Sequence, residues 1–116
     1  SIIRAKFCEV IAEELGLAEE RSQFFMMGMF SLLDVLMNEQ LDSLLTELPI
    51  SEDIKNALLG RDGIYGQVFE IVLSYEKAEW KKVDEKTEEL GLQEEKLADI
   101  YGEAIDWCNK VLIESS

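Results

Sequence analysis

The sequence predicts an all-α fold, a compact bundle of about six to seven helices. Apolar side chains recur at helical spacing along most of the 116 residues, and no alternating apolar and polar run bounded by turn residues is typical of a strand. The long stretches without glycine are rich in Glu, Leu, Lys and Ala, which favour helices, and the only proline is Pro49. An apolar fraction of 47% is enough for a core. We therefore expect one folded domain over residues 1–116.

The first predicted helix covers residues 2–15, where apolar residues return every three or four positions. Gly16 is expected to end it in a left-handed conformation, with Leu17 folding back onto the last turn. Residues 13–20 read EELGLAEE, and residues 88–95 repeat this phrase as EELGLQEE. We interpret the repeat as one local solution used twice: a helix end, a glycine cap, an apolar contact and then acidic residues at the positive end of the next helix.

Residues 20–37 are apolar on nearly all sides, which predicts a buried central helix. Its one strip of small or polar residues is formed by Gly28, Ser31 and Asp34, which lie three apart and would let another helix approach closely. The methionines of this segment have two interpretations, core filling or an adaptable binding groove, and core filling is the favoured one. They are Met26, Met27, Met29 and Met37.

The remaining helices are predicted from the same periodicity and from local capping residues. Pro49 should stop a short helix, and Ser51 should cap the next one, with Glu52 and Asp53 in its first turn. A break near residues 77–80 is also expected, although neither Gly nor Pro enforces it there. The predicted helices are 40–48, 52–59, a longer one from Asp62 to about Glu76, 81–90 and 93–113.

The charge balance restricts the partners of this chain. There are 25 acidic and 11 basic residues, a formal charge of -14, and such a surface repels phosphate backbones and anionic membranes. We expect neither nucleic acid nor a membrane as a partner. Cys8 and Cys108 lie within helical patterns and are predicted to be reduced core thiols, as in a cytoplasmic protein. The sequence also lacks a signal-peptide or membrane-spanning pattern.

Catalytic chemistry has few candidates because the chain contains no histidine. This excludes His-activated nucleophiles and His-ligated metal sites, so we predict no cofactor and no metal. Asp34, on an apolar helix, is the one candidate general acid. The favoured interpretation is instead a carboxylate that is hydrogen-bonded to a helix terminus or points out of the strip. The turn containing Arg61, Asp62 and Gly63 resembles a phosphate nest. A helix junction capped by Asp62 is favoured, because Arg61 is the only basic residue nearby.

The segment from Phe24 to Leu36 resembles the central helix of HDOD domains, which are regulatory relatives of the HD phosphohydrolases. In that register Gly28 is the family glycine, and Ser31 and Leu32 stand where the catalytic relatives carry their metal-binding His-Asp dyad. Further matching phrases follow in order: Leu45 to Ser51, Ala57 to Arg61, Gly63, Gly66, Tyr75-Glu76 and Trp80. The sequence departs from the family pattern at Ala78 and Glu79, where a glycine and an aspartate are usual.

The resemblance implies a non-catalytic output domain with a degenerate metal site, of the kind attached to EAL domains, which bind or hydrolyse cyclic di-GMP in bacteria. HDOD domains usually run longer, so the resemblance also implies a piece without its N-terminal helices. The implied partners are a neighbouring domain, another signalling protein or a second copy of the chain. The alternative function is a degenerate phosphohydrolase or nucleotide-sensing domain that uses Asp34, Arg61 and the glycine-rich turn.

Overall fold

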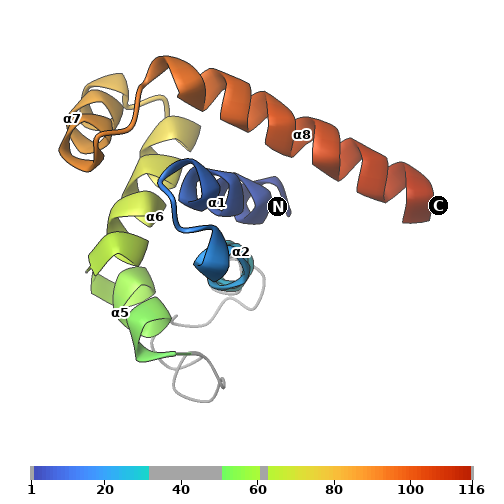
Figure 1. Ribbon diagram of the computed structural model, residues 1–116, viewed down its shortest axis with the longest axis horizontal. Coiled ribbons are helices and arrows are strands. Elements are labelled where there is room, and N and C mark those ends of the chain that lie inside the picture. The colour runs from blue at the N-terminus through green and yellow to red at the C-terminus, as the bar shows by residue number, and fades with distance from the viewer. Residues whose placement is uncertain (1, 32–50, 61–62, 116) are drawn as a thin grey trace.

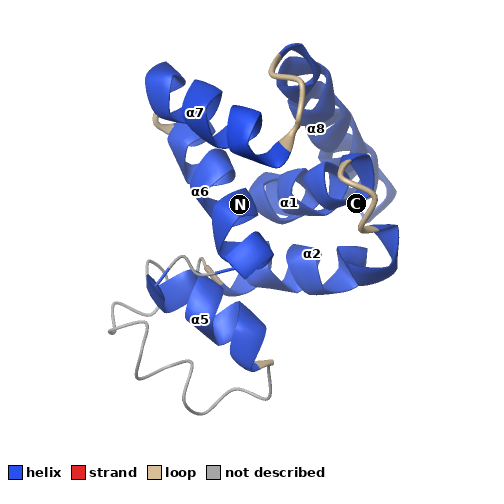
Figure 2. Ribbon diagram, turned by 60° about the vertical axis from the view of Figure 1, so that its left-hand side comes forward, coloured by secondary structure: helices blue, strands red, loops and turns tan. Residues whose placement is uncertain are grey.

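The computed structural model describes residues 2–31, 51–60 and 63–115, and it confirms the all-α class. The described parts of the chain contain helices and turns and no strand (Figure 2). The predicted short helix at 40–48 and its stop at Pro49 lie outside the described residues. The observed helices are α1 (Ile2–Glu14), the 3-10 helix η1 (Ala18–Glu20), α2 (Arg21–Phe30), α5 (Glu52–Gly60), α6 (Gly63–Glu76), α7 (Trp80–Leu90) and α8 (Glu95–Ser115).

Helix α1 lies at the centre of the arrangement, in contact with α2, α6 and α8. Helix α6 also contacts α5 and α7, and α7 lies where the end of α6 comes near the start of α8 (Figure 1). Helix α8 runs along one side of α1, and its C-terminal end extends past the other helices. None of the helices within the described ranges is long and apolar enough to cross a membrane.

The prediction that residues 20–37 form the buried central helix is wrong for their described part. In α2 only Phe24, Met27 and Gly28 are buried, whereas the residue exposures of Met26 and Met29 are 39% and 40%. Of the methionines predicted as core, Met27 alone among those described fills the core. Counting apolar residues overestimated the burial of α2, because they surround the helix while only one of its sides meets α1.

Helix α1 takes the central position because its apolar residues are spread around it and several are small. Its buried residues are Ala5, Phe7, Cys8, Val10, Ile11 and Ala12. Phe7 belongs to an aromatic cluster with Tyr75, Trp80 and Tyr101. The centroid of the Phe7 ring lies 5.3 Å from that of Tyr75 and 5.1 Å from that of Tyr101. The Trp80 and Tyr75 ring centroids are 5.3 Å apart. This cluster joins α1, α6, α7 and α8, and such ring pairs add to the stability that burial alone provides.

The repeated phrase forms the same helix end twice, as predicted. Gly16 and Gly91 both have left-handed backbones, with φ of 83° and 72°. In each copy the residue after the glycine donates its N–H to the carbonyl five residues back, at 2.8 Å for Leu17 and 2.9 Å for Leu92. This pair of features is the Schellman motif, which satisfies carbonyls that the helix end would otherwise leave unpaired. Ser51 also caps α5 as predicted, accepting a bond from the Ile54 N–H at 3.3 Å.

A third Schellman motif ends α6 and uses alanine in place of glycine. Ala78 has a φ of 58°, and Glu79 donates its N–H to the Ser74 carbonyl at 2.9 Å. The break expected near residues 77–80 is therefore present without a glycine. An L-residue in the left-handed region costs about 1 kcal/mol, because its Cβ crowds the backbone.

Replacing Ala78 by glycine should therefore stabilise the protein by roughly 0.5–1 kcal/mol, because the left-handed conformation loses its steric penalty. The free energy of unfolding, measured by urea denaturation, is the readout. The matched control is Gly91→Ala, where an added Cβ would meet nothing within 4 Å, so that only the φ of 72° opposes it. That variant should lose about 1 kcal/mol. A lower stability for Ala78→Gly would contradict this account of the helix break.

Candidate functional site

The predicted site begins where α2 crosses α1 at Gly28. A Cβ built on Gly28 would lie 2.5 Å from the Ala5 Cα, closer than such atoms approach, and 3.1 Å from the Arg4 carbonyl oxygen, which is a tight contact. The neighbouring atoms belong to the backbone of α1, so they have no side-chain freedom with which to yield. Gly28, the described glycine of the predicted strip, thus lets the two helices approach closely and sets the end of α2 beside the first turn of α1.

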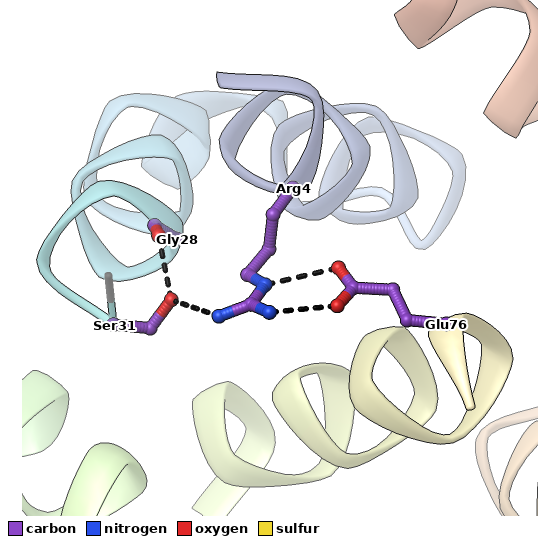
Figure 3. Close-up of polar contacts among 4 residues, drawn as sticks. All are labelled: Arg4, Gly28, Ser31 and Glu76. Atoms are coloured by element: carbon purple, nitrogen blue, oxygen red, sulfur yellow. Dashed lines mark hydrogen bonds and ion pairs between the residues drawn. The ribbon is translucent and has the colours of Figure 1, made fainter. Parts of the chain in front are cut away.

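This crossing places Ser31, the first of the two predicted dyad positions, next to Arg4. Figure 3 shows the Arg4 guanidinium between Ser31 of α2 and Glu76 of α6. Arg4 donates Nε to Glu76 Oε2 at 2.9 Å, Nη2 to Oε1 at 2.7 Å and Nη1 to Ser31 Oγ at 3.1 Å. Ser31 Oγ in turn donates to the Gly28 carbonyl at 2.6 Å. We call these four residues the arginine cluster.

Both charges of the cluster stand at the helix end that disfavours them. Arg4 lies in the first turn of α1, near the positive end of its dipole, and Glu76 is the last residue of α6, near the negative end. Their side chains are only 20% and 28% exposed. A two-pronged ion pair satisfies both groups at once, and this geometry is the strong form of an arginine–carboxylate contact. The pair therefore connects α1 to the end of α6.

The arginine cluster leaves little chemistry for Ser31 to perform. Ser31 as a residue is 7% exposed, and its hydroxyl accepts from a guanidinium and donates to a carbonyl. The Arg4 guanidinium, with Nη1 at 3.1 Å from Ser31 Oγ, also takes up the space beside this hydroxyl, so a cation would have to displace Arg4 to bind there. Within residues 2–31, 51–60 and 63–115, no group of three or more Cys, Asp or Glu side chains is arranged to hold a metal ion.

The other predicted site residues are not gathered at this point by the described structure. Leu32, Asp34, Arg61 and Asp62 lie outside the described residues. Gly63 begins α6 with a φ of 69° and lines a cavity of about 400 Å³. Neither Gly28 nor Ser31 is among the residues that line this cavity. The residues that line the cavity are Glu20, Gln23, Asp53, Asn56, Gly63, Ile64 and Tyr65.

The cavity beside Gly63 is acidic. Glu20 and Asp53 line it, and none of its described lining residues is basic. Tyr65 donates its hydroxyl to Gln23 Oε1 at 2.9 Å, and burial together with the two carboxylates raises the pKa of the phenol, so that it stays neutral. Carboxylates repel a phosphate group, so this lining does not favour the phosphate-nest interpretation of the glycine-rich turn.

The two cysteines match their predicted role. Cys8 and Cys108 are both free and buried, with residue exposures of 0% and 2%. Desolvation is the main cause that raises the pKa of the Cys8 thiol to about 12, so the thiolate is scarce at neutral pH. A buried thiol of this kind is an unreactive core residue.

Sequence reasoning missed Arg4, the partner of Ser31, and Glu76, the partner of Arg4. Arg4 and Glu76 are separated by 72 residues, and no local pattern pairs them. One signal was available, because each charge lies at the unfavourable end of a predicted helix and so calls for a compensating partner. Choosing that partner among 25 acidic residues requires the packing of α1 against α6.

Comparison with known proteins gives relatives of much greater length. The chain is 34% identical over 111 residues to the Vibrio cholerae protein named cyclic di-GMP phosphodiesterase CdgJ, and 33% identical over 112 residues to the Bacillus subtilis protein YuxH. These matches cover 96% and 97% of this chain but only 26% and 27% of the relatives, so it spans about a quarter of their length. No family model matches the chain. No solved structure matches it significantly.

The helix crossing predicts a sharp difference between two glycines. Gly28→Ala should destabilise the protein by about 2–3 kcal/mol, because the new methyl group forces α2 away from the α1 backbone. The control is Gly102→Ala in α8, where a Cβ meets nothing within 4 Å and the helix should gain up to about 1 kcal/mol. Urea denaturation of both variants is the measurement. Equal stability of the two variants would show that the close approach is unimportant.

The arginine cluster predicts that Arg4→Met destabilises the protein by about 1–3 kcal/mol, since Glu76 and the Ser31 hydroxyl lose their donors in a partly buried setting. The matched control is Lys82→Met, which removes a cation from the exposed pair with Glu79, where the N–O distance is 3.8 Å. That change should stay below about 0.5 kcal/mol. Thermal denaturation at low and high salt is the measurement, and a loss no larger than that of the control would refute the structural role of Arg4.

Proposed function

We propose that this chain is a non-catalytic regulatory domain of a bacterial signalling protein connected with cyclic di-GMP, and that it acts through contacts with a neighbouring domain or another protein. The single observation that carries the proposal is the arginine cluster. Where the HDOD resemblance places the metal-binding dyad of catalytic relatives, Ser31 is fully hydrogen-bonded beside a guanidinium. Substrate activation by a metal requires an open coordination position, and a fixed cation opposes one.

The link to cyclic di-GMP rests on the similarity to CdgJ, whose name describes a cyclic di-GMP phosphodiesterase. Because the match covers 26% of that protein, the similarity fits a domain that accompanies the catalytic part. The order of the HDOD-like phrases along the chain also supports this assignment. We propose accordingly that residues 1–116 form an HDOD-like domain, part of a longer protein, in the cytoplasm.

The alternative is a degenerate phosphohydrolase or nucleotide-sensing domain. The observation in its favour is the cavity beside Gly63, about 400 Å³ in volume. Two carboxylates among its described lining residues count against a phosphate ligand, so the regulatory role is the stronger proposal.

The test measures turnover and binding by the purified chain. With Mg²⁺ or Mn²⁺ present, we expect no hydrolysis of cyclic di-GMP or of a generic phosphodiester, and no saturable heat when cyclic di-GMP is titrated in by calorimetry. Asp34→Asn serves as the matched variant, because it removes the one candidate general acid. Metal-dependent turnover that this variant abolishes would contradict the proposal.

The regulatory role is tested in a second experiment on CdgJ, the longer relative. Deleting the matching region of CdgJ should change the rate of cyclic di-GMP hydrolysis by roughly fivefold or more, as expected for coupling between domains. The Arg4→Met change, introduced at the matching position, should have part of that effect if the fold transmits it. An unchanged rate after the deletion would argue against regulation of catalysis by this region.

A further inference from the structure

One large aromatic side chain of the core is left half in solvent. Trp80 is the outer member of the aromatic cluster, and 52% of it is exposed. Its ring lies at 82° to that of Tyr75, with the centroids 5.3 Å apart, so the two rings stand almost at right angles. Tryptophan is costly to leave in water, and an exposed one beside a second ring frequently marks a binding surface.

Tyr75 and Trp80 line an open pocket of about 320 Å³ between the end of α6, the start of α7 and the start of α8. Val83 and Ala98 are its apolar lining residues, and the exposed Glu94 and Glu95, which we call its rim, supply carboxylates. The complete lining is Tyr75, Trp80, Val83, Glu94, Glu95 and Ala98. An aromatic corner with acidic groups at its edge combines the two features that attract an organic cation.

The rim carries negative charge that the described chain does not neutralise. Among the described residues no basic side chain forms an ion pair with Glu94 or Glu95, and the adjacent Lys96 is engaged by Glu14 at 2.6 Å. Glu94 shares a hydrogen bond with the Asp84 carboxyl, and this bond is the main cause that raises the pKa of Glu94. Asp84 thus adds a third carboxyl group next to the two glutamates.

We infer that this aromatic corner is a docking site for a lysine or arginine side chain of a partner polypeptide. The cation would lie against the faces of Trp80 and Tyr75 and toward the carboxylates at the rim. The overall charge of -14 also favours a basic partner. This inference deepens the proposed function and rests on it, since it names the surface and the partner chemistry through which the domain would act.

A second pocket that Trp80 lines does not offer the same site. Its other lining residues are Glu79, Lys81, Lys82 and Glu85, two acidic and two basic side chains. Lys82 already lies 3.8 Å from Glu79. The partner's cation is therefore expected on the side of Glu94 and Glu95.

The test follows the indole N–H signals of the ¹⁵N-labelled chain during titration with a short glycine–serine peptide that contains one arginine. The chain has two tryptophans, and Trp80→Phe assigns their signals. We expect a saturable shift of the Trp80 signal and none at Trp107, with binding weakened about threefold to tenfold when citrulline replaces arginine or when Trp80 becomes alanine, the Trp80 variants being followed by the backbone amide signals of α7. The far-ultraviolet circular dichroism of each variant checks its fold, and Trp80→Phe should bind with intermediate strength.

The rim is tested by Glu94→Gln with Glu95→Gln, which should weaken binding about threefold and reduce its salt dependence. The matched control, Asp99→Asn with Glu103→Gln, removes the same charge from exposed residues of α8 outside the cavity and should leave binding unchanged. Equal effects of the two pairs, equal binding of the citrulline peptide, or equally tight binding of free tetramethylammonium would overturn the inference. Such a result leaves the proposed function standing, because regulation is measured separately by the CdgJ deletion.

Discussion

The close approach of α2 to α1 at Gly28 is the constraint on which the rest of the structure depends. With 2.5 Å between a hypothetical Cβ and the Ala5 Cα, the helices meet backbone to backbone. That contact puts Ser31 beside Arg4, and Arg4 then binds the last residue of α6. From the same first turns of α1, Phe7 reaches the rings of Tyr75 and Tyr101. A missing side chain on α2 thus sets how α2 lies on α1, and the first turns of α1 in turn contact α6 and α8.

The sequence allowed good predictions wherever structure is decided locally. Helix ends are local, since a left-handed glycine and the apolar residue after it determine the cap, and Gly16 and Gly91 behaved as predicted. The exposure of the α2 side chains, by contrast, is not determined by local sequence. Its composition predicted burial on all sides, but Met26 and Met29 face away from α1, which already has apolar partners on several sides. How many neighbours a helix finds is a property of the whole bundle, and periodicity within one helix does not encode it.

The candidate site shows the same division. Ser31 was identified from the register of the resemblance, and its burial agrees with a core position. Its chemical state depends on Arg4 and Glu76, which come from two other helices and lie 72 residues apart. The residue types at a degenerate position say only that a metal ligand is absent. Tertiary structure is needed to see that the Arg4 guanidinium, paired with the Glu76 carboxylate, lies beside Ser31. This ion pair carries the functional proposal.

The left-handed backbone of Ala78 has a geometric consequence for the surface of the molecule. In an uninterrupted helix, residues five apart point about 140° away from each other around the axis, so Tyr75 and Trp80 could not touch. The reversal at Ala78 returns the chain toward α6 and brings the second ring to 5.3 Å from the first. The perpendicular pair of rings is therefore made by a bend of the main chain. A residue with no functional group of its own gives the molecule its aromatic corner, and the strain in its backbone is the cost of that shape.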